Sequence, residues 1–254
     1  MSAGAEMAGW QKTMKFCIQA ACACLAGKAS GSNEDNLFFN GRCLPANNSG
    51  MHNIDELEQQ VNEGLCMAVF SGTGGNRNGA WAAYAAAKRM QELERKEKDY
   101  FELSKAYLQN ITQELNQAVT AEGKRLGMSS PGISMAALYF SSGNVYACNV
   151  GSSQIYLSRA SALFQMSRAS ASSCVLGLSA EEEPLLPHIC KNELVCGDKY
   201  LICSSSVSKA LRGLEIEDIL IRNPDPSRCV RELIDGAFSS GSKDSITAIV
   251  CKIS

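Results

Sequence analysis

The sequence predicts an α+β fold built on antiparallel sheets, and three observations lead to this prediction. Apolar runs of strand length occur near both ends of the chain and around its middle. Two long helical patterns follow each other, at about 78–97 and 99–124. Between residues 132 and 167, short alternating strands are separated by two-residue turns, which join antiparallel neighbours. The order of strands, two helices, strands, helices and a last strand is typical of an α+β domain.

The first part of the chain supplies strands and one insertion. Residues 14–27 predict a strand that enters the core, and residues 33–45 predict its partner after a polar turn. Residues 53–64 predict a short helix or a loop insertion, because their first asparagine is followed three residues later by a glutamate, which is a helix-capping pattern. Residues 65–71 are almost continuously apolar, as expected of a strand buried on both faces.

The second part of the chain alternates strands and helices. Residues 132–167 predict four strands, with turns at Ser142-Gly143, Gly151-Ser152 and Ala160-Ser161. A loop rich in serine and proline follows at 169–187. The remaining predicted elements are a strand at 199–206, helices at 215–222 and 226–238, and a last strand at 245–254.

Composition and charge restrict the function classes. The chain has 254 residues, a formal net charge of −2 and a pI of about 5.8, so no overall positive field favours nucleic acid or a membrane surface. No flexible linker or internal repeat stands out, and we expect a tail at 1–13 followed by a single domain at 14–254. The apolar run near the N-terminus is too short to span a bilayer, and no signal pattern precedes it.

The twelve cysteines do not form a metal-binding pattern. No Cys-x-x-Cys pair is present, and the only histidines are His52 and His188. A structural zinc site is therefore not expected. Most of the cysteines lie within apolar, strand-like runs, where a thiol behaves as a small hydrophobic group. Reduced thiols and the missing signal pattern predict a cytoplasmic protein that does not insert into membranes.

Five short motifs, in order along the chain, carry a resemblance to a known family. They are an acidic turn "SNEDN", a strand that runs into the turn "AVFSGTGG", a hairpin "NVGSSQIYL", a strand end "LICSSSVSKAL" and the segment "GSKDSITAIV" before the last strand. In order and spacing, the chain resembles the PPM-type (protein phosphatase 2C) metal-dependent serine/threonine phosphatases over nearly its whole length. The resemblance implies a four-layer sandwich, in which two central antiparallel β-sheets are flanked by pairs of α-helices.

The same resemblance implies a chemistry that this chain lacks the carboxylates to perform. Enzymes of that family use two divalent metals to activate water for attack on a phosphoserine or phosphothreonine. Ser71 stands at the position of the metal-bridging aspartate, Ser152 at the aspartate of the hairpin, and Ser205 at the aspartate of the strand end, where Ser206 also replaces a glycine. A neutral hydroxyl cannot offset the repulsion between two cations or the dehydration of Mg²⁺ or Mn²⁺. These three positions are therefore degenerate catalytic positions.

Four possible metal ligands remain: Glu34, Asp35, the backbone carbonyl of Gly72, and Asp244. Each also has a plain structural role to play, as a turn acid or a capping group. Upstream of the acidic turn, Lys28 is the only cation in the region where the family holds phosphate with an arginine. Neither histidine lies in a motif, so no base is evident for a serine nucleophile.

Three functions follow as alternatives. The leading hypothesis is a pseudophosphatase that binds a phosphoprotein or signalling partner without a cofactor. The binding surface would be the old cleft, which is the former active-site cleft between Ser71, Ser152 and Ser205, or the charged surface at about 89–98. The rival is a weak serine/threonine phosphatase that uses the remaining ligands to hold Mn²⁺ or Mg²⁺. The third is metal-free binding of phosphate by backbone amides of the turn that holds Gly72, Gly74 and Gly75, at the start of the first helix.

Overall fold

The computed structural model describes residues 16–28, 32–61, 64–72, 77–96, 103–127, 132–168, 175–178 and 185–254. Its elements in chain order are β1 (Cys17–Leu25), β2 (Asp35–Phe38), β3 (Asp55–Gln60), β4 (Leu65–Gly72), α1 (Arg77–Lys96), α2 (Lys105–Arg125), β5 (Ile133–Ser141), β6 (Asn144–Val150), β7 (Gln154–Arg159), β8 (Ala162–Gln165), β9 (His188–Glu193), β10 (Lys199–Cys203), α3 (Ser205–Ala210), α4 (Gly213–Arg222), α5 (Pro226–Ser239) and β11 (Ile246–Ile253). None of the helices in these ranges combines the length and the apolar character needed to cross a membrane.

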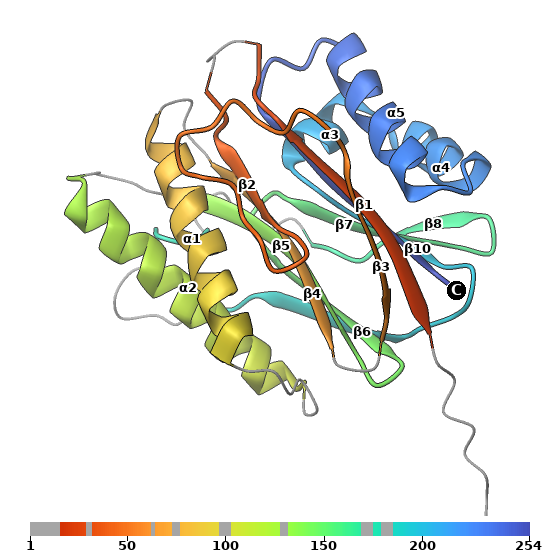
Figure 1. Ribbon diagram of the computed structural model, residues 1–254, viewed down its shortest axis with the longest axis horizontal. Helices are drawn as coiled ribbons and strands as arrows, with labels where there is room; N and C mark the ends of the chain where they lie inside the picture. The colour runs from red at the N-terminus through yellow and green to blue at the C-terminus, as the bar shows by residue number, and fades with distance from the viewer. Residues whose placement is uncertain are drawn as a thin grey trace, which may run out of the picture.

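The strands form two antiparallel sheets, as predicted. One sheet has six strands in the order β3-β1-β11-β10-β7-β8, and the other has five in the order β2-β4-β5-β6-β9. The two long helices α1 and α2 cover the outer face of the five-stranded sheet, and α3, α4 and α5 cover the outer face of the six-stranded sheet (Figure 1). The predicted α+β arrangement of two central sheets between helices is therefore confirmed.

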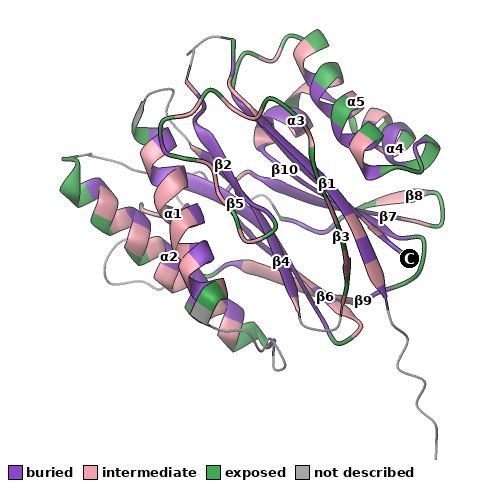
Figure 2. Cartoon of the chain, viewed as in Figure 1, coloured by how far each residue is buried: buried purple, intermediate pink, exposed green. Residues whose placement is uncertain are grey.

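Three apolar clusters hold the two sheets and the two outer layers of helices together. One buried cluster lies between the sheets, a second lies between the five-stranded sheet and α1–α2, and a third lies between the six-stranded sheet and α3–α5. The central strands are buried along most of their length, whereas the helices expose their outer faces (Figure 2). Strand β4 shows why a continuous apolar run is required: Leu65, Met67 and Val69 pack between the sheets, while Phe70 packs against the helices.

The predicted helix or loop insertion at 53–64 is wrong, because residues 55–60 form the edge strand β3, paired with β1. The apolar residues of this segment include Ile54, Leu57 and Val61. In the structure they serve two sides of a strand, because Ile54 packs under the C-terminal helices and Leu57 packs between the sheets. The backbone pairing with β1 outweighs the local capping pattern.

Two further elements were not predicted. Strand β9 begins directly after the loop expected at 169–187, and its sequence His-Ile-Cys-Lys-Asn-Glu is too polar to indicate a strand. Helix α3 has six residues and begins in a run of serines, so it carries no helical period. Most of the predicted loop, and the predicted tail at 1–13, lie outside the described residues.

Candidate functional site: a buried carboxylate among hydroxyl groups

The five motif segments meet at one end of the two sheets. They come from the turn before β2, the end of β4, the β6–β7 turn, the junction of β10 with α3, and the start of β11. Antiparallel pairing places them together, since the end of one strand lies beside the beginning of its neighbour. The spacing of the motifs in the sequence thus becomes a single site in the fold.

Asp35 lies at the centre of this site and is 2% exposed. It pairs directly across the sheet with Ser71, at the position where the resemblance implies a bridging aspartate. The Thr247 hydroxyl donates a hydrogen bond to Asp35 Oδ2 at 2.8 Å, and the hydroxyls of Ser71 and Ser204 also hydrogen-bond to this carboxyl group. Because Ser204 Oγ accepts the Thr247 amide at 3.1 Å, its own proton is free to point at Asp35.

The surroundings of Asp35 favour its neutral form. Burial raises the pKa of Asp35 to about 7, the hydroxyls of Ser71, Thr247 and Ser204 lower it, and the nearby Glu34 raises it. The Cys24 thiol lies 3.1 Å from Thr247 Oγ1, and burial raises the pKa of Cys24 to about 12, so this thiol is protonated. Asp35 is therefore a carboxyl group whose oxygens face hydroxyl groups of its own chain.

Glu34 is fixed by its backbone and points toward the first long helix. Its amide donates to Ser245 Oγ at 3.0 Å, and its carbonyl accepts from the Gly72 amide at 3.1 Å. A Cβ atom placed on Gly79, in the first turn of α1, would lie 3.2 Å from Glu34 Oε2. The carboxylate thus lies where the amides of a helix N-terminus favour negative charge.

Gly72 is required by close packing at this point. A Cβ on Gly72 would lie 2.7 Å from Gly79 Cα and 2.8 Å from the Glu34 carbonyl oxygen. Glycine therefore allows β4 and α1 to approach each other beside the acidic turn. The Glu34 carbonyl is bound to the Gly72 amide, so the turn and the strand end are joined through the backbone.

Ser152 lies in the β6–β7 turn and is half-buried. Its carbonyl accepts a hydrogen bond from Gln154 Nε2 at 3.0 Å. The preceding Gly151 has φ +80°, and a Cβ there would lie 2.7 Å from the Ser134 side chain. Ser134 contacts the Ser153 hydroxyl at 2.8 Å and pairs across the sheet with Ser71, so neutral hydroxyls line this edge of the site.

The other predicted site residues are placed less centrally. Ser205 is the first residue of α3, next to Ser204, and Asp244 is exposed just before β11. Lys28, the only cation expected near a phosphate, lies with its Nζ 5.3 Å from the centre of the Phe238 ring. Gly74 and Gly75 lie outside the described residues, so the predicted phosphate-binding turn is represented by Gly72 alone.

The residues at this site do not fit a pair of divalent metals. Within the described ranges, no three His, Cys, Asp or Glu side chains are arranged so that they could hold a metal ion. Two cations need several charged oxygens and a bridging carboxylate, whereas here Ser71 is neutral and Asp35 is occupied by hydroxyl donors.

Sequence reasoning missed the hydroxyl partners of Asp35. Ser204 lies in the strand-end motif, directly before Ser205, so the motif itself contained that signal. Thr247 is 212 residues from Asp35 along the chain; it lies in the last motif, but its residue type does not mark it as a site residue. Ser245 replaces the asparagine that the resemblance implies, and its hydroxyl accepts the Glu34 amide.

Comparison with solved structures confirms the predicted fold. The catalytic domain of the serine/threonine protein phosphatase PstP, solved in complex with two manganese ions, is 19% identical with a TM-score of 0.74, over 94% of this chain and 99% of that chain. The PPM Ser-Thr phosphatase MsPP from Mycobacterium smegmatis, in complex with cacodylate, is 20% identical with a TM-score of 0.67, over 92% and 97% of the two chains. PppA of Pseudomonas aeruginosa, described as a key regulatory component of T6SS, is 20% identical with a TM-score of 0.73, over 93% and 98%. No protein-family model matches the sequence, and no curated protein matches it.

Proposed function

We propose that this chain, whose fold is that of the PPM-type serine/threonine phosphatases, has lost two-metal hydrolysis and acts as a pseudophosphatase that binds a partner protein. The fold keeps its three apolar clusters, so selection on the core alone does not explain the altered site. The changes instead fall on residues that would face the metals. Ser71, Ser152 and Ser205 all replace acids with short hydroxyl side chains.

The observation that carries this proposal is the hydrogen bonding of Asp35. A carboxylate that ligates metal must be ionised and must direct its oxygens at the ion. Asp35 is buried, its pKa is about 7, and its oxygens accept from Thr247, Ser71 and Ser204. These bonds stabilise the site without a cation, and an incoming ion would have to break them.

The partner we infer is a phosphoprotein or another signalling protein that contacts the old cleft beside Ser71, Ser152 and Ser205. Hydroxyl groups there offer neutral donors and acceptors. Free phosphate on the turn before α1 is less favoured, because the Glu34 carboxylate already lies against the first turn of that helix. A protein surface that is complementary to these neutral hydroxyl groups fits the site better than a small, highly charged anion.

The rival function is weak, manganese-dependent phosphatase activity that uses Glu34, Asp35, the Gly72 carbonyl and Asp244. A chromogenic phosphate ester assayed with millimolar manganese separates the two. We expect no release of phosphate above the rate with buffer and metal alone, because the described residues do not offer the charged ligands that activate water. The matched control is Asp244→Ala, which removes the one exposed acid of the set and should leave this background unchanged.

Turnover that requires manganese and disappears in Asp244→Ala would establish the enzyme and refute the proposal. A direct binding arm uses thermal unfolding with a phosphoserine peptide and with its unphosphorylated form. A ligand that binds only the folded chain raises the melting temperature. A higher melting temperature with the phosphopeptide would identify phosphoproteins as the partner class. If neither peptide raised the melting temperature, the partner would be sought among unphosphorylated proteins.

A further inference from the structure

A second cavity is lined by none of the candidate site residues described above. A cavity of about 430 Å³ opens between the β7–β8 hairpin and β9, which end their respective sheets. Alternate residues of β9, His188, Cys190 and Asn192, line one wall because they share one face of that strand. Residues of β7, β8 and the following segment line the other wall, from Leu157 to Arg168. The volume is in the range of small-molecule sites.

Part of the lining is apolar and belongs to the end of the core between the sheets. Leu157 and Met166 are buried members of that core cluster. Phe164, on the same hairpin, also lines the cavity and is 52% exposed. The cavity therefore has a buried apolar floor and an aromatic side chain at its rim, features that hold an apolar body.

The charged side chains among the lining residues are two arginines, so both are cationic. No carboxylate lines the cavity among the described residues, whereas Arg159, Arg168 and His188 do. Arg159 is neutralised, because its guanidinium donates to both Asp198 oxygens at 2.7 and 2.6 Å. Arg168 is exposed and makes no ion pair within the ranges that the structure describes. Burial, Arg168 and Lys105 lower the pKa of His188, which places this ring in a cationic environment.

Two buried polar atoms have no hydrogen-bond partner in the described structure: Nδ1 of His188, which lines the cavity, and Oδ1 of Asn149, which does not. The two residues are directly opposite each other on β9 and β6, and therefore share one face of the sheet. Asn149 is 2% exposed, and its amide group donates to the carbonyls of Met135 and Ser153, so only its oxygen is left over. Unpaired buried groups are rare in a core and often accompany a binding site.

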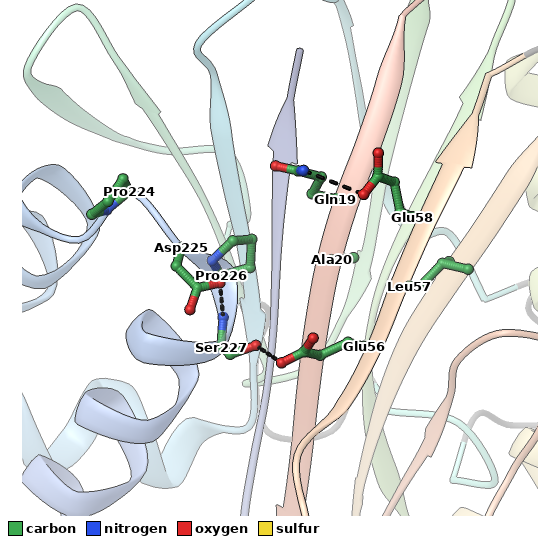
Figure 3. Close-up of a pocket in the computed structure, with 9 residues that line it drawn as sticks. All are labelled: Gln19, Ala20, Glu56, Leu57, Glu58, Pro224, Asp225, Pro226 and Ser227. Atoms are coloured by element: carbon green, nitrogen blue, oxygen red, sulfur yellow. Dashed lines mark hydrogen bonds between the residues drawn. The ribbon is translucent and has the colours of Figure 1, made fainter.

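A second groove provides a contrast. It encloses about 470 Å³ between β1, β3 and the start of α5, and Figure 3 shows its carboxylates bound within the chain. Ser227 donates to Glu56, Gln19 donates to Glu58, and the Ser227 amide donates to Asp225. Its acids are already satisfied, so this groove gives no reason to infer a ligand. The cavity between the β7–β8 hairpin and β9, called the β8–β9 cavity below, differs from this groove. Its Arg168 makes no ion pair in the described ranges, and Nδ1 of His188 has no hydrogen-bond partner there.

We propose that the β8–β9 cavity binds an organic anion, with an apolar body against Leu157, Met166 and Phe164 and a carboxylate, sulfonate or phosphate group at Arg168. His188, which lines the same cavity, would supply a further polar group to the ligand. The inference is independent of the proposed function, since neither the degenerate positions Ser71, Ser152 and Ser205 nor the possible metal ligands line this cavity.

The test is a fluorescence titration with anilinonaphthalene sulfonate, an aromatic anion of this class. We expect saturable binding of one probe per folded chain. Phe164→Ser and Arg168→Glu should each weaken it by about tenfold or more, because each removes one half of the recognition. Two matched variants should not weaken it: Leu214→Ser removes an exposed apolar side chain on α4, and Lys191→Glu reverses a charge on the opposite face of β9.

Competition then defines the ligand chemistry. Phenylacetate and phenyl phosphate should displace the probe, and uncharged benzyl alcohol should do so about tenfold less well or worse. Thermal unfolding of each variant verifies that the fold is retained. The variants Leu214→Ser and Lys191→Glu, whose affinity for the probe should not change, control for general destabilisation. Absence of saturable binding, equal losses in all four variants, or equal competition by benzyl alcohol would each overturn the proposal.

Discussion

Ser71→Asp is expected to destabilise the metal-free chain strongly and to make its stability depend on manganese. The new carboxylate would face Asp35 directly across the β2–β4 pair, in a place where both residues are buried. Asp35 would lose a hydroxyl donor and gain a like charge, and an uncompensated buried charge destabilises a fold by roughly 3–5 kcal/mol. Chemical denaturation with and without millimolar manganese measures the effect.

The neutral variant Ser71→Asn is the matched control. It has the size of aspartate but adds no charge, so we expect a smaller loss of stability and no response to manganese. In Ser71→Asp, manganese should recover much of the lost stability, because a cation between two carboxylates removes their repulsion. If Ser71→Asp were as stable as the wild-type chain without metal, the description of position 71 as a neutral place beside a buried acid would be refuted.

The second large effect concerns pH and Asp35. The pKa of Asp35 is about 7 in the folded chain, against an ordinary value of 3.8, so between these two values the folded state binds the additional proton. The stabilisation from this group is complete below about pH 4 and is lost as the pH rises through about 7. The difference between the two pKa values corresponds to roughly 4 kcal/mol.

Asp35→Asn isolates this contribution from all other titrating groups. Asparagine keeps one of the two oxygen acceptors of the carboxyl group and cannot ionise, so any loss from the missing acceptor is the same at every pH. Relative to the wild-type chain, this variant should therefore become progressively more stable between about pH 4 and pH 8. Urea unfolding at a series of pH values gives the two curves, and parallel curves would show that Asp35 does not titrate as its surroundings require.

Much of the fold could be predicted because its signals are local. The apolar run of β4 and the two-residue turns between β5 and β8 each follow from a few neighbouring residues. The order of the five motifs then placed these elements in one architecture. Strand β3 was mistaken for a helix or loop because the capping pattern of Asn53 and Glu56 is local, whereas the pairing with β1 that decides its structure is not.

The candidate site was predicted in part for a similar reason. Its degenerate positions, such as Ser71, could be identified because each belongs to a short motif. The hydrogen bonds of Asp35 could not be predicted, although Ser204 and Thr247 stand within two of the motifs, since their strands come together with Asp35 only in the folded sheets. The consequence of that assembly, an acid whose pKa is about 7, is a property of burial and cannot be obtained from residue types alone.

Calorimetric titration of manganese into the unmodified protein tests the central claim most directly. At millimolar metal we predict only the heat of dilution, since Asp35 is engaged by three hydroxyl groups and position 71 carries no charge. Saturable uptake of two ions per chain, accompanied by manganese-dependent release of phosphate from an ester, would contradict the account.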